Sequence, residues 1–278
     1  MTTSSEHYPE ERAVTAASAI VDSRVSGRQL GPLPDHLRPP DLQDAYHVQQ
    51  LAHGLLISAG YGRIGGWKIG CTTAVMQEYL GVESPVAGAM FRSAMWQGQH
   101  RFEVSPPRVL GVECEIAVRV SKNMDRHDQP YSIAEAADAV SVSMAAIEVV
   151  ENRYVDYLTM DIPTQVADDF YHFASVVGVE HESFDPHSLK DVHASMSING
   201  HSVGSGKGSD ILGDPLIALA WLASTLAQRG SPLQSGDVVS LGSLVKTQWV
   251  DVGDAVVVHN DLLGEVRATF EARGANSR

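Results

Sequence analysis

Residues 109–120 (VLGVECEIAVRV) carry the pattern that most restricts how this chain folds. In an extended strand, successive side chains point to opposite faces, so residues two apart share a face. One face of this predicted strand is apolar, and it consists of Val112, Cys114, Ile116 and Val118. The opposite face places Glu113 and Glu115 side by side, with Ala117 beyond them. The chain therefore needs a sheet that buries one face of this strand and accommodates two adjacent carboxylates on the other.

Helical patterns lead the chain. Residues 1–60 predict two helices, and the second begins at Asp41, a good N-cap residue, with Asp44 in its first turn. Its apolar residues follow helical spacing, at Ala45, Val48, Leu51, Ala52 and Leu55. Ser132 and Glu135 form a capping box, and we expect the helix that they open to run over residues 133–150. Asp214-Pro215 predicts the start of a further amphipathic helix, which ends at Gly230.

Strands dominate the later part of the chain. Residues 195–204 (SMSINGHSVG) predict a hairpin whose tight turn is Asn199-Gly200. From Asp237 to Phe270 the sequence consists mostly of strand-like runs separated by turn residues. Helices that lead and strands that follow predict an α+β fold with a mixed or largely antiparallel sheet, not a regular βαβ alternation.

Composition narrows the function classes. The 278 residues have a net charge of −14, which argues against a nucleic-acid binder or a membrane-surface protein. Cys71 and Cys114 are the two cysteines, too few for a disulfide scaffold or a cysteine-based zinc site. The N-terminal residues are polar and acidic, unlike a signal peptide, and no apolar run approaches the ~20 residues of a membrane helix. We therefore expect a cytoplasmic protein.

Glu113 and Glu115 are the first candidates for chemistry. Two neighbouring like charges stay ionised only if water or a cation lies between them. Sites rich in carboxylate oxygen suit Mg²⁺, Mn²⁺ or Ca²⁺. Taken alone, such a pair is more often part of a solvated acidic strand face, because such pairs are common on surfaces.

Glu148 is a third candidate acid because it lies in an otherwise apolar stretch, residues 144–150. A lone carboxylate in such a stretch either lies on a wet face, which Glu151 would share, or is buried with a partner. If it meets Glu113 and Glu115, the three acids form an oxygen site with open positions for water and substrate.

Lys68 is one of five lysines and lies between Trp67 and Ile69 in a glycine-rich segment, residues 65–70. It either lines a tight pocket, where it binds a carboxylate or has a lowered pKa, or extends from an edge strand into solvent. The chain contains no Walker spacing, no HExxH and no GxSxG, so a phosphate loop, a standard zinc protease site and a standard serine hydrolase are unsupported.

Several segments resemble one family when they are taken in order. The set resembles the 2-keto-4-pentenoate hydratase / 4-oxalocrotonate decarboxylase family, within the fumarylacetoacetate hydrolase superfamily, over nearly the whole chain. The segments that carry the resemblance are GGWKIGCTTAVMQEYLGV, VECEIAVRV, AAIEVVENRYVDY, SGKGSDILGDPLIALAWLA and LQSGDVVSLGS.

The resemblance implies a fold and a set of roles. It implies a fumarylacetoacetate hydrolase-like mixed β-roll with flanking helices, residues 1–60 being an N-terminal helical segment and residues 61–278 the catalytic domain. The family's metal-binding acids, which hold Mg²⁺ or Mn²⁺, match Glu113, Glu115 and Glu148.

The resemblance also implies which residues meet the substrate. Lys68 matches the family's catalytic pocket lysine, which binds the substrate carboxylate or moves a proton. Gly242 and Ser243 match the segment that closes over the substrate carboxylate.

The implied activity is hydration of a 2-hydroxy-dienoate or related 2-oxo acid from aromatic meta-cleavage, through a metal-stabilised enolate. The implied partners are this small molecule and further copies of the chain in a homo-oligomer. A decarboxylase, or a C–C hydrolase acting on a 1,3-dicarbonyl acid, would use the same enolate. A non-catalytic partner of such an enzyme is the third alternative.

Two segments depart from the family pattern. Where the family often has P-D-F-G, residues 85–88 read PVAG, so that Val86 replaces an acid implicated in proton transfer. Where the family often has A-D-N-A-S, residues 167–171 read ADDFY. We therefore expect Phe170 and Tyr171 to bind substrate as an aromatic pocket wall and to select a substrate unlike the simplest pentadienoate.

Overall fold

The computed structural model describes residues 8–126 and 128–273, which form two compact units. The first unit comprises, within the described residues, 8–63 and Asn152–Tyr171. The second comprises Ile64–Glu151 and the described residues from His172 onward. Residues 1–7, which belong to the polar N-terminus discussed above, lie outside the described residues.

The first unit is helical. Helix α2 begins as predicted, because the Asp41 side chain accepts a hydrogen bond from the Asp44 backbone N–H at 2.9 Å. Small and branched apolar side chains from α1 and α2, such as Ala17, Ile20 and Val48, are wholly buried in this unit. Its elements are α1 (Glu10–Ser26), α2 (Leu42–Leu56), the π-helical turn η1 (Ile57–Tyr61), η3 (Tyr157–Thr159), α5 (Ile162–Ala167) and η4 (Asp169–Tyr171).

A buried ionic network joins the segments of the first unit. The Arg153 guanidinium donates from Nε to Asp168 Oδ2 at 2.6 Å, and the Tyr154 hydroxyl donates to the same oxygen at 3.1 Å. Arg24 lies 2.7 Å from the neighbouring Asp169 carboxylate. Burial raises the pKa of the Asp168 carboxyl even though Arg153 and Arg24 oppose this effect. Ionisation of Asp168 therefore depends on its cationic partners, Arg153 and Arg24.

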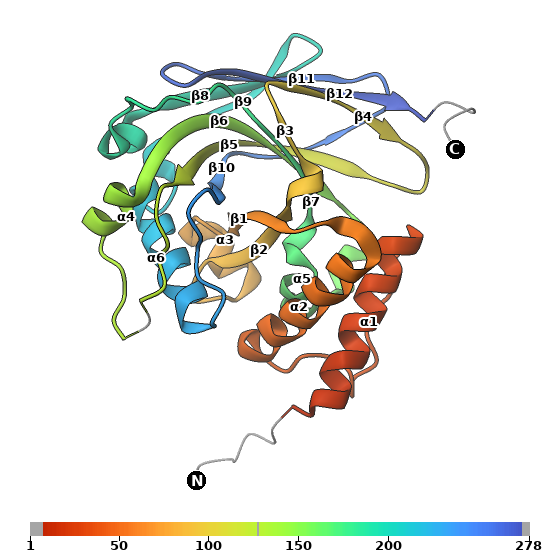
Figure 1. Ribbon diagram of the computed structural model, residues 1–278. Helices are drawn as coiled ribbons and strands as arrows, with labels where there is room; N and C mark the ends of the chain where they lie inside the picture. Colours follow the sequence, from red (N-terminus) through yellow and green to blue (C-terminus); the bar gives the residue numbers. More distant parts are fainter. Residues whose placement is uncertain (1–7, 127, 274–278) are drawn as a thin grey trace. The chain divides into compact units, whose positions relative to one another are not determined.

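The second unit contains two sheets (Figure 1). The seven-stranded sheet has the order β2-β1-β10-β5-β6-β7-β3, and the five-stranded sheet has the order β4-β12-β11-β8-β9. The pairs β1–β10, β3–β7 and β4–β12 are parallel and the others are antiparallel, so the sheets are mixed and the α+β expectation is confirmed. The strands are β1 (Ile64–Gly70), β2 (Val86–Phe91), β3 (Met95–Gln97), β4 (Gln99–Val104), β5 (Leu110–Val120), β6 (Val140–Glu151), β7 (His172–Val177), β8 (His193–Ile198), β9 (His201–Lys207), β10 (Val238–Val250), β11 (Ala255–Asn260) and β12 (Gly264–Ala272).

The core of this unit lies between the two sheets and under its helices. Phe102 of β4 stacks on Phe270 of β12 at 5.4 Å between ring centroids, and Phe270 is wholly buried. Ile116 of β5 and Ile147 of β6 are also wholly buried. The helices of the unit are α3 (Ala74–Leu80), η2 (Arg92–Ala94), α4 (Ile133–Ala139), η5 (Pro186–Asp191), η6 (Gly208–Asp210) and α6 (Pro215–Gln228).

The strand, hairpin and helix-start predictions are confirmed. Strand β5 covers Leu110–Val120, and β8 and β9 meet at Asn199-Gly200, whose positive φ angles of 54° and 79° fit a primed turn. The Asp214 side chain caps α6 by accepting from the Leu216 backbone N–H at 2.9 Å.

The helix predicted over residues 133–150 is wrong. The capping box of Ser132 and Glu135 is present, but α4 ends at Ala139 and strand β6 starts at Val140. The reason is the sequence after residue 139, where VSVS alternates with a period of two and an apolar run follows. Residues of β6 from Val142 onward are buried on both faces between β5 and β7, and β-branched side chains suit that environment. Glu148 consequently lies on a strand.

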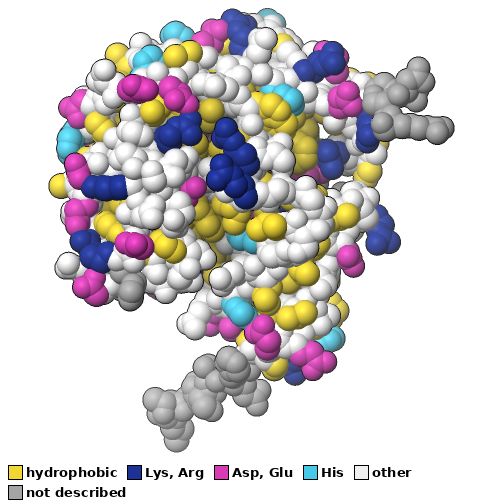
Figure 2. All heavy atoms as spheres, viewed as in Figure 1, with side chains coloured by type: hydrophobic (Ala, Val, Ile, Leu, Met, Phe, Trp, Pro, Cys, Tyr) yellow, Lys and Arg dark blue, Asp and Glu magenta, His cyan; other side chains and the backbone are white. Residues whose placement is uncertain are grey.

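The surface carries charges of both signs. Acidic and basic side chains are interspersed over the face shown in Figure 2 and form no continuous basic stripe there. Within the described residues, no helix is both long enough and apolar enough to span a membrane.

The first prediction concerns the buried network of the first unit. Substituting Arg153→Met leaves the Asp168 carboxylate buried without its guanidinium, and removing one partner of a buried pair typically costs about 3–5 kcal/mol. Denaturant unfolding measures the loss. The matched control is Arg101→Met, which removes the exposed Arg101–Glu271 pair and is expected to change stability by less than about 1 kcal/mol. Equal losses for the two variants would contradict the prediction.

Candidate metal and substrate site

Three carboxylates converge on one face of the seven-stranded sheet. Strand pairing sets Glu113 of β5 directly opposite Glu148 of β6, and Glu115 follows two residues later on the same face. Ligand oxygens of the three side chains all lie within 4.8 Å of one another. The structure thus brings together the acids that the sequence singled out. The helix predicted from the sequence over residues 133–150 placed Glu148 on the wrong element.

Strand β10 supplies donors to two of these acids. The Ser240 hydroxyl donates to Glu115 Oε2 at 2.6 Å, and the Gly242 backbone N–H donates to the same oxygen at 2.9 Å. The Thr247 hydroxyl donates to Glu113 Oε1. Neither Ser240 nor Thr247 was predicted as a site residue. Their hydroxyls, in the strand-like region after Asp237, were the available signal, and only the structure places that strand beside β5.

Gly242 is required by local geometry. Its φ is +129°, and a Cβ at this position would come within 2.4 Å of the Thr72 hydroxyl oxygen. Ser243, its neighbour, donates from its hydroxyl to the Val245 backbone carbonyl at 2.7 Å. The backbone N–H of Gly242 therefore serves to hold Glu115. The substrate-carboxylate role expected for Gly242 and Ser243 stays a prediction.

Glu148 is wholly buried, and its two oxygens differ in their surroundings. Oε1 lies 3.1 Å from Lys68 Nζ and 3.1 Å from His172 Nδ1. Among the described residues, Oε2 has no hydrogen-bond partner. A buried, ionised carboxylate oxygen needs a compensating partner. The three acids with this uncompensated oxygen therefore fit a divalent cation such as Mg²⁺ or Ca²⁺, because these ions are bound by oxygen ligands alone.

Lys68 is buried within the seven-stranded sheet. Strand β1 pairs with β10 on one side and β2 on the other, and Lys68 is 2 % exposed. The alternative of an edge-strand lysine that extends into solvent is therefore wrong. Its ammonium group faces a cluster of three carboxylates, which together carry more negative charge than one ammonium can balance.

The pKa directions follow from this burial. Burial, reinforced by the charge of Glu148, raises the pKa of Glu113 and raises that of Glu115 further. Burial is the largest influence on Lys68 and Glu148 as well and opposes their ionisation, but the nearby opposite charges and hydrogen bonds together outweigh it. The Lys68 pKa is therefore raised and the Glu148 pKa is lowered, with His172 assisting the latter. At neutral pH Lys68 is an ammonium and Glu148 is a carboxylate.

Val86 and the cysteines contribute no ionised group here. Gly88 pairs with Lys68 across β1 and β2, and Val86, two residues away, is wholly buried on the same strand face. Burial raises the pKa of Cys71 to about 11 and that of Cys114 to about 12. Both thiols are therefore protonated at neutral pH and are poor nucleophiles.

Phe170 and Tyr171 belong to the helical first unit. The Tyr171 ring lies edge-on to Tyr154 at 5.2 Å and to Phe170 at 5.6 Å between centroids. Both side chains are half-buried. Their expected part in binding substrate stays a prediction.

Comparison with known proteins places the chain in a family. Residues 84–271, more than half of the chain, match the model of the fumarylacetoacetate (FAA) hydrolase C-terminal region. The chain belongs to the fumarylacetoacetate hydrolase family. The three acids and the β10 residues that hold them lie within the matched region, whereas Lys68 precedes it.

Relatives match nearly the whole chain. A 2-keto-4-pentenoate hydratase of Paraburkholderia xenovorans is 31% identical over 268 residues, 96% of this chain and 98% of that protein. A TodF product hydratase of Pseudomonas putida is 33% identical over 258 residues, 92% of this chain and 94% of that protein. The chain, which keeps the buried acids and lysine together, is an enzyme of this family.

A solved structure shares the fold. The 4-oxalocrotonate decarboxylase from Pseudomonas putida G7, complexed with magnesium and adipate, superposes with a TM-score of 0.86 and is 25% identical. The match covers 94% of this chain and 98% of the decarboxylase. A second structure of that decarboxylase contains calcium and acetate. Both complexes hold a divalent ion of the class that the carboxylate cluster of this chain fits.

The second prediction concerns metal affinity and pH. Burial raises the pKa of Glu113 and Glu115, so in the metal-free protein these carboxyls keep protons to higher pH than free glutamate. A cation has to displace those protons, so the apparent affinity for Mg²⁺ should continue to rise with pH above the range in which free glutamate titrates. Calorimetric titration with Mg²⁺ in buffers of different ionisation enthalpy measures the affinity and the protons released.

The control for this experiment is Glu271→Gln, which removes an exposed acid and should leave the pH dependence unchanged. An affinity that does not vary with pH and a titration without proton release would contradict the prediction.

Proposed function

We propose that the protein is a divalent-metal-dependent hydratase that adds water to a 2-hydroxy-2,4-dienoate or its 2-oxo tautomer, in the degradation of aromatic compounds by meta-cleavage. The observation that carries the proposal is the group of three clustered carboxylates beside a buried ammonium group, in a chain similar over its length to 2-keto-4-pentenoate hydratases. In the 2-oxo-3-enoate tautomer, water adds across the C3=C4 bond. The hydroxyl joins C4 and the proton joins C3.

Mg²⁺ or Mn²⁺ is the proposed cofactor, held by Glu113, Glu115 and Glu148. When bound, such an ion supplies a Lewis acid that stabilises negative charge on the oxygens of a 2-oxo acid. The fit rests on the all-oxygen donor set and on the uncompensated Glu148 Oε2.

Lys68 supplies the mobile positive charge of the site. Its raised pKa keeps the ammonium protonated at neutral pH, so it acts as a proton donor or as a partner for the substrate carboxylate. It reaches the substrate by leaving Glu148, which His172 continues to hold. Because Val86 cannot carry a proton, we favour proton donation by Lys68.

A decarboxylase is the second candidate. It is favoured by the fold match to 4-oxalocrotonate decarboxylase. The 2-oxo group, with a bound metal ion as Lewis acid, would accept the electron pair released as CO₂ departs. Cleavage of a C–C bond in a 1,3-dicarbonyl acid would use the same site.

Product analysis separates these reactions. The purified enzyme with Mg²⁺ is incubated with 2-hydroxypenta-2,4-dienoate and with 4-oxalocrotonate. A hydratase yields a 4-hydroxy-2-oxo acid heavier than its substrate by one water, whereas a decarboxylase releases CO₂ and a C–C hydrolase yields two fragments. A dienoate that disappears only by one of the other routes would overturn the hydratase proposal.

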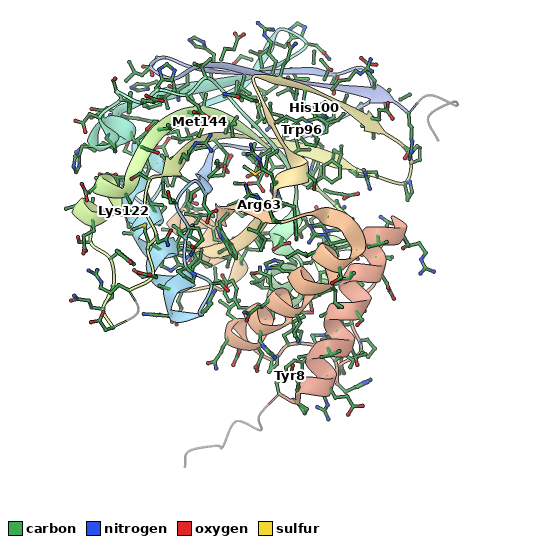
Figure 3. All side chains as sticks on the ribbon, viewed as in Figure 1. Tyr8, Arg63, Trp96, His100, Lys122 and Met144 are labelled. Atoms are coloured by element: carbon green, nitrogen blue, oxygen red, sulfur yellow. The ribbon has the colours of Figure 1, made fainter. Side chains whose placement is uncertain are left out.

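The third prediction concerns Lys68. Lys68→Met keeps the length of the side chain and removes its charge, so loss of proton donation should lower kcat by about 10²–10⁴-fold. Steady-state kinetics on the dienoate that the wild-type enzyme hydrates measure kcat and KM, and Mg²⁺ titration checks that the metal still binds. The control is Lys122→Met, whose ammonium pairs with Asp138 at the surface (Figure 3).

The split between kcat and KM identifies the role of Lys68. A raised KM with kcat little changed would instead indicate binding of the substrate carboxylate. Wild-type values of both constants in Lys68→Met would contradict both roles.

The fourth prediction concerns substrate choice. We propose that Phe170 and Tyr171 form an aromatic wall that favours substrates larger than the simplest pentadienoate. Tyr171→Ser should therefore shift the ratio of kcat/KM values toward the shorter dienoate, because a truncated wall loses contact with the longer chain. Competition between dienoates of two chain lengths measures the ratio, and an unchanged ratio would contradict the wall.

Two further expectations belong to the same proposal. We propose that the enzyme forms a homo-oligomer, which sedimentation equilibrium measures directly, and that it acts in the cytoplasm on a small soluble acid.

A further inference from the structure

The backbone that leads to His172 is unusual. Three consecutive residues without the freedom of glycine, Asp169, Phe170 and Tyr171, have positive φ angles of 54°, 44° and 68°. Each such conformation is strained, and strained residues of this kind gather where function requires a particular geometry. The next residue along the chain is His172, the first residue of β7.

The pairing of β7 with β6 is also irregular at this point. Ser175 pairs with Glu148 and Ala174 with Val149, but the next pair joins His172 to Val150. The bulge skips Phe173. Side chains that pair directly share a face, so His172 lies on the face of Val150 and Glu148, which is the face of the carboxylate cluster. In a regular register, Phe173 would pair with Val150 and take this position.

The contact that results is specific. His172 is 1 % exposed, and its Nδ1 lies 3.1 Å from Glu148 Oε1. Because an ionised carboxylate only accepts hydrogen bonds, Nδ1 carries the hydrogen of this pair. Lys68 occupies the same oxygen. Both donors therefore hold Oε1, and Oε2 is the oxygen left for a cation.

The two donors hold Glu148 differently. The Lys68 ammonium is a point charge on a flexible four-carbon stem. The His172 side chain is short and has few rotatable bonds. The bulged strand that carries it fixes the position of its backbone. When Lys68 turns toward a substrate, the imidazole contact remains.

We propose that His172 is a positioning residue that fixes the rotamer of Glu148 and directs Oε2 toward the metal ion, both with and without the Lys68 contact. The inference rests on the proposed function only in taking Glu148 as a metal ligand. It assigns to His172 no proton transfer and no contact with substrate.

The test measures metal affinity, which does not depend on knowing the substrate. Mn²⁺ binding to the full-length protein is followed by electron paramagnetic resonance for three variants of His172. His172→Leu removes the donor, His172→Gln moves it by one bond, and His172→Asn places an amide nitrogen near the Nδ1 position. Loss of a partner that orients a metal ligand typically weakens metal affinity by about 10–100-fold.

We expect His172→Leu and His172→Gln to bind Mn²⁺ about 10–100-fold more weakly than the wild type, and His172→Asn to recover most of the affinity. The matched control is His181→Leu, because His181 also borders β6 but lies opposite Ser143 rather than Glu148. This control should bind Mn²⁺ with wild-type affinity. If His172→Leu does not fold, the comparison of His172→Asn with His172→Gln carries the same test.

Each other outcome overturns the inference. Wild-type affinity in His172→Leu or His172→Gln would show that Glu148 needs no such support. Equal weakening in His172→Asn and His172→Gln, or in His181→Leu, would show a general effect of disturbing β6. A protein that binds Mn²⁺ as expected but hydrates no dienoate would leave this inference standing and refute only the proposed function.

Discussion

Repulsion among three clustered carboxylates, two of them buried, governs the arrangement of this site. Glu115 and Glu148 are almost inaccessible to water, and Glu113 lies beside them, so their charges are poorly screened. Such a group is costly unless donors and cations surround it, because charge in a poorly solvated interior is stabilised mainly by its neighbours. Lys68 and His172 on one side, and the β10 donors on the other, provide part of that compensation. A divalent ion would supply the remainder.

The order of strands explains why these groups meet. Strand β5, which carries Glu113 and Glu115, lies between β10 and β6. One neighbour supplies hydroxyl and backbone donors, and the other supplies Glu148. Strand β1 adds Lys68 from the far side of β10. The three acids and the β10 donors thus become neighbours because they lie on adjacent strands, and the backbone ladder sets their spacing. Lys68 reaches Glu148 across β10 and β5.

Register shifts in these strands place donor groups beside the acids, where a regular ladder would not. Register shifts in β10 bring Ser240 and Gly242 to the same Glu115 oxygen, and the shift between β6 and β7 brings His172 to Glu148. Bulges change the direction of a side chain without ending the strand, which is why they recur beside functional sites. The site is therefore built on sheet elements whose positions the surrounding core holds rigidly.

The sequence by itself determined the strand Leu110–Val120, the helix starts at Asp41 and Asp214, the Asn199-Gly200 turn and the acidic pair, because each depends on local spacing or on a capping side chain. Family resemblance then linked Glu148 and Lys68 to that pair. Only the tertiary structure decided that residues 140–151 form a strand and that His172 faces Glu148. The capping box at Ser132 does open a helix, but burial between two strands ends it at Ala139. The register that turns His172 inward depends on pairing between distant segments, which no local pattern encodes.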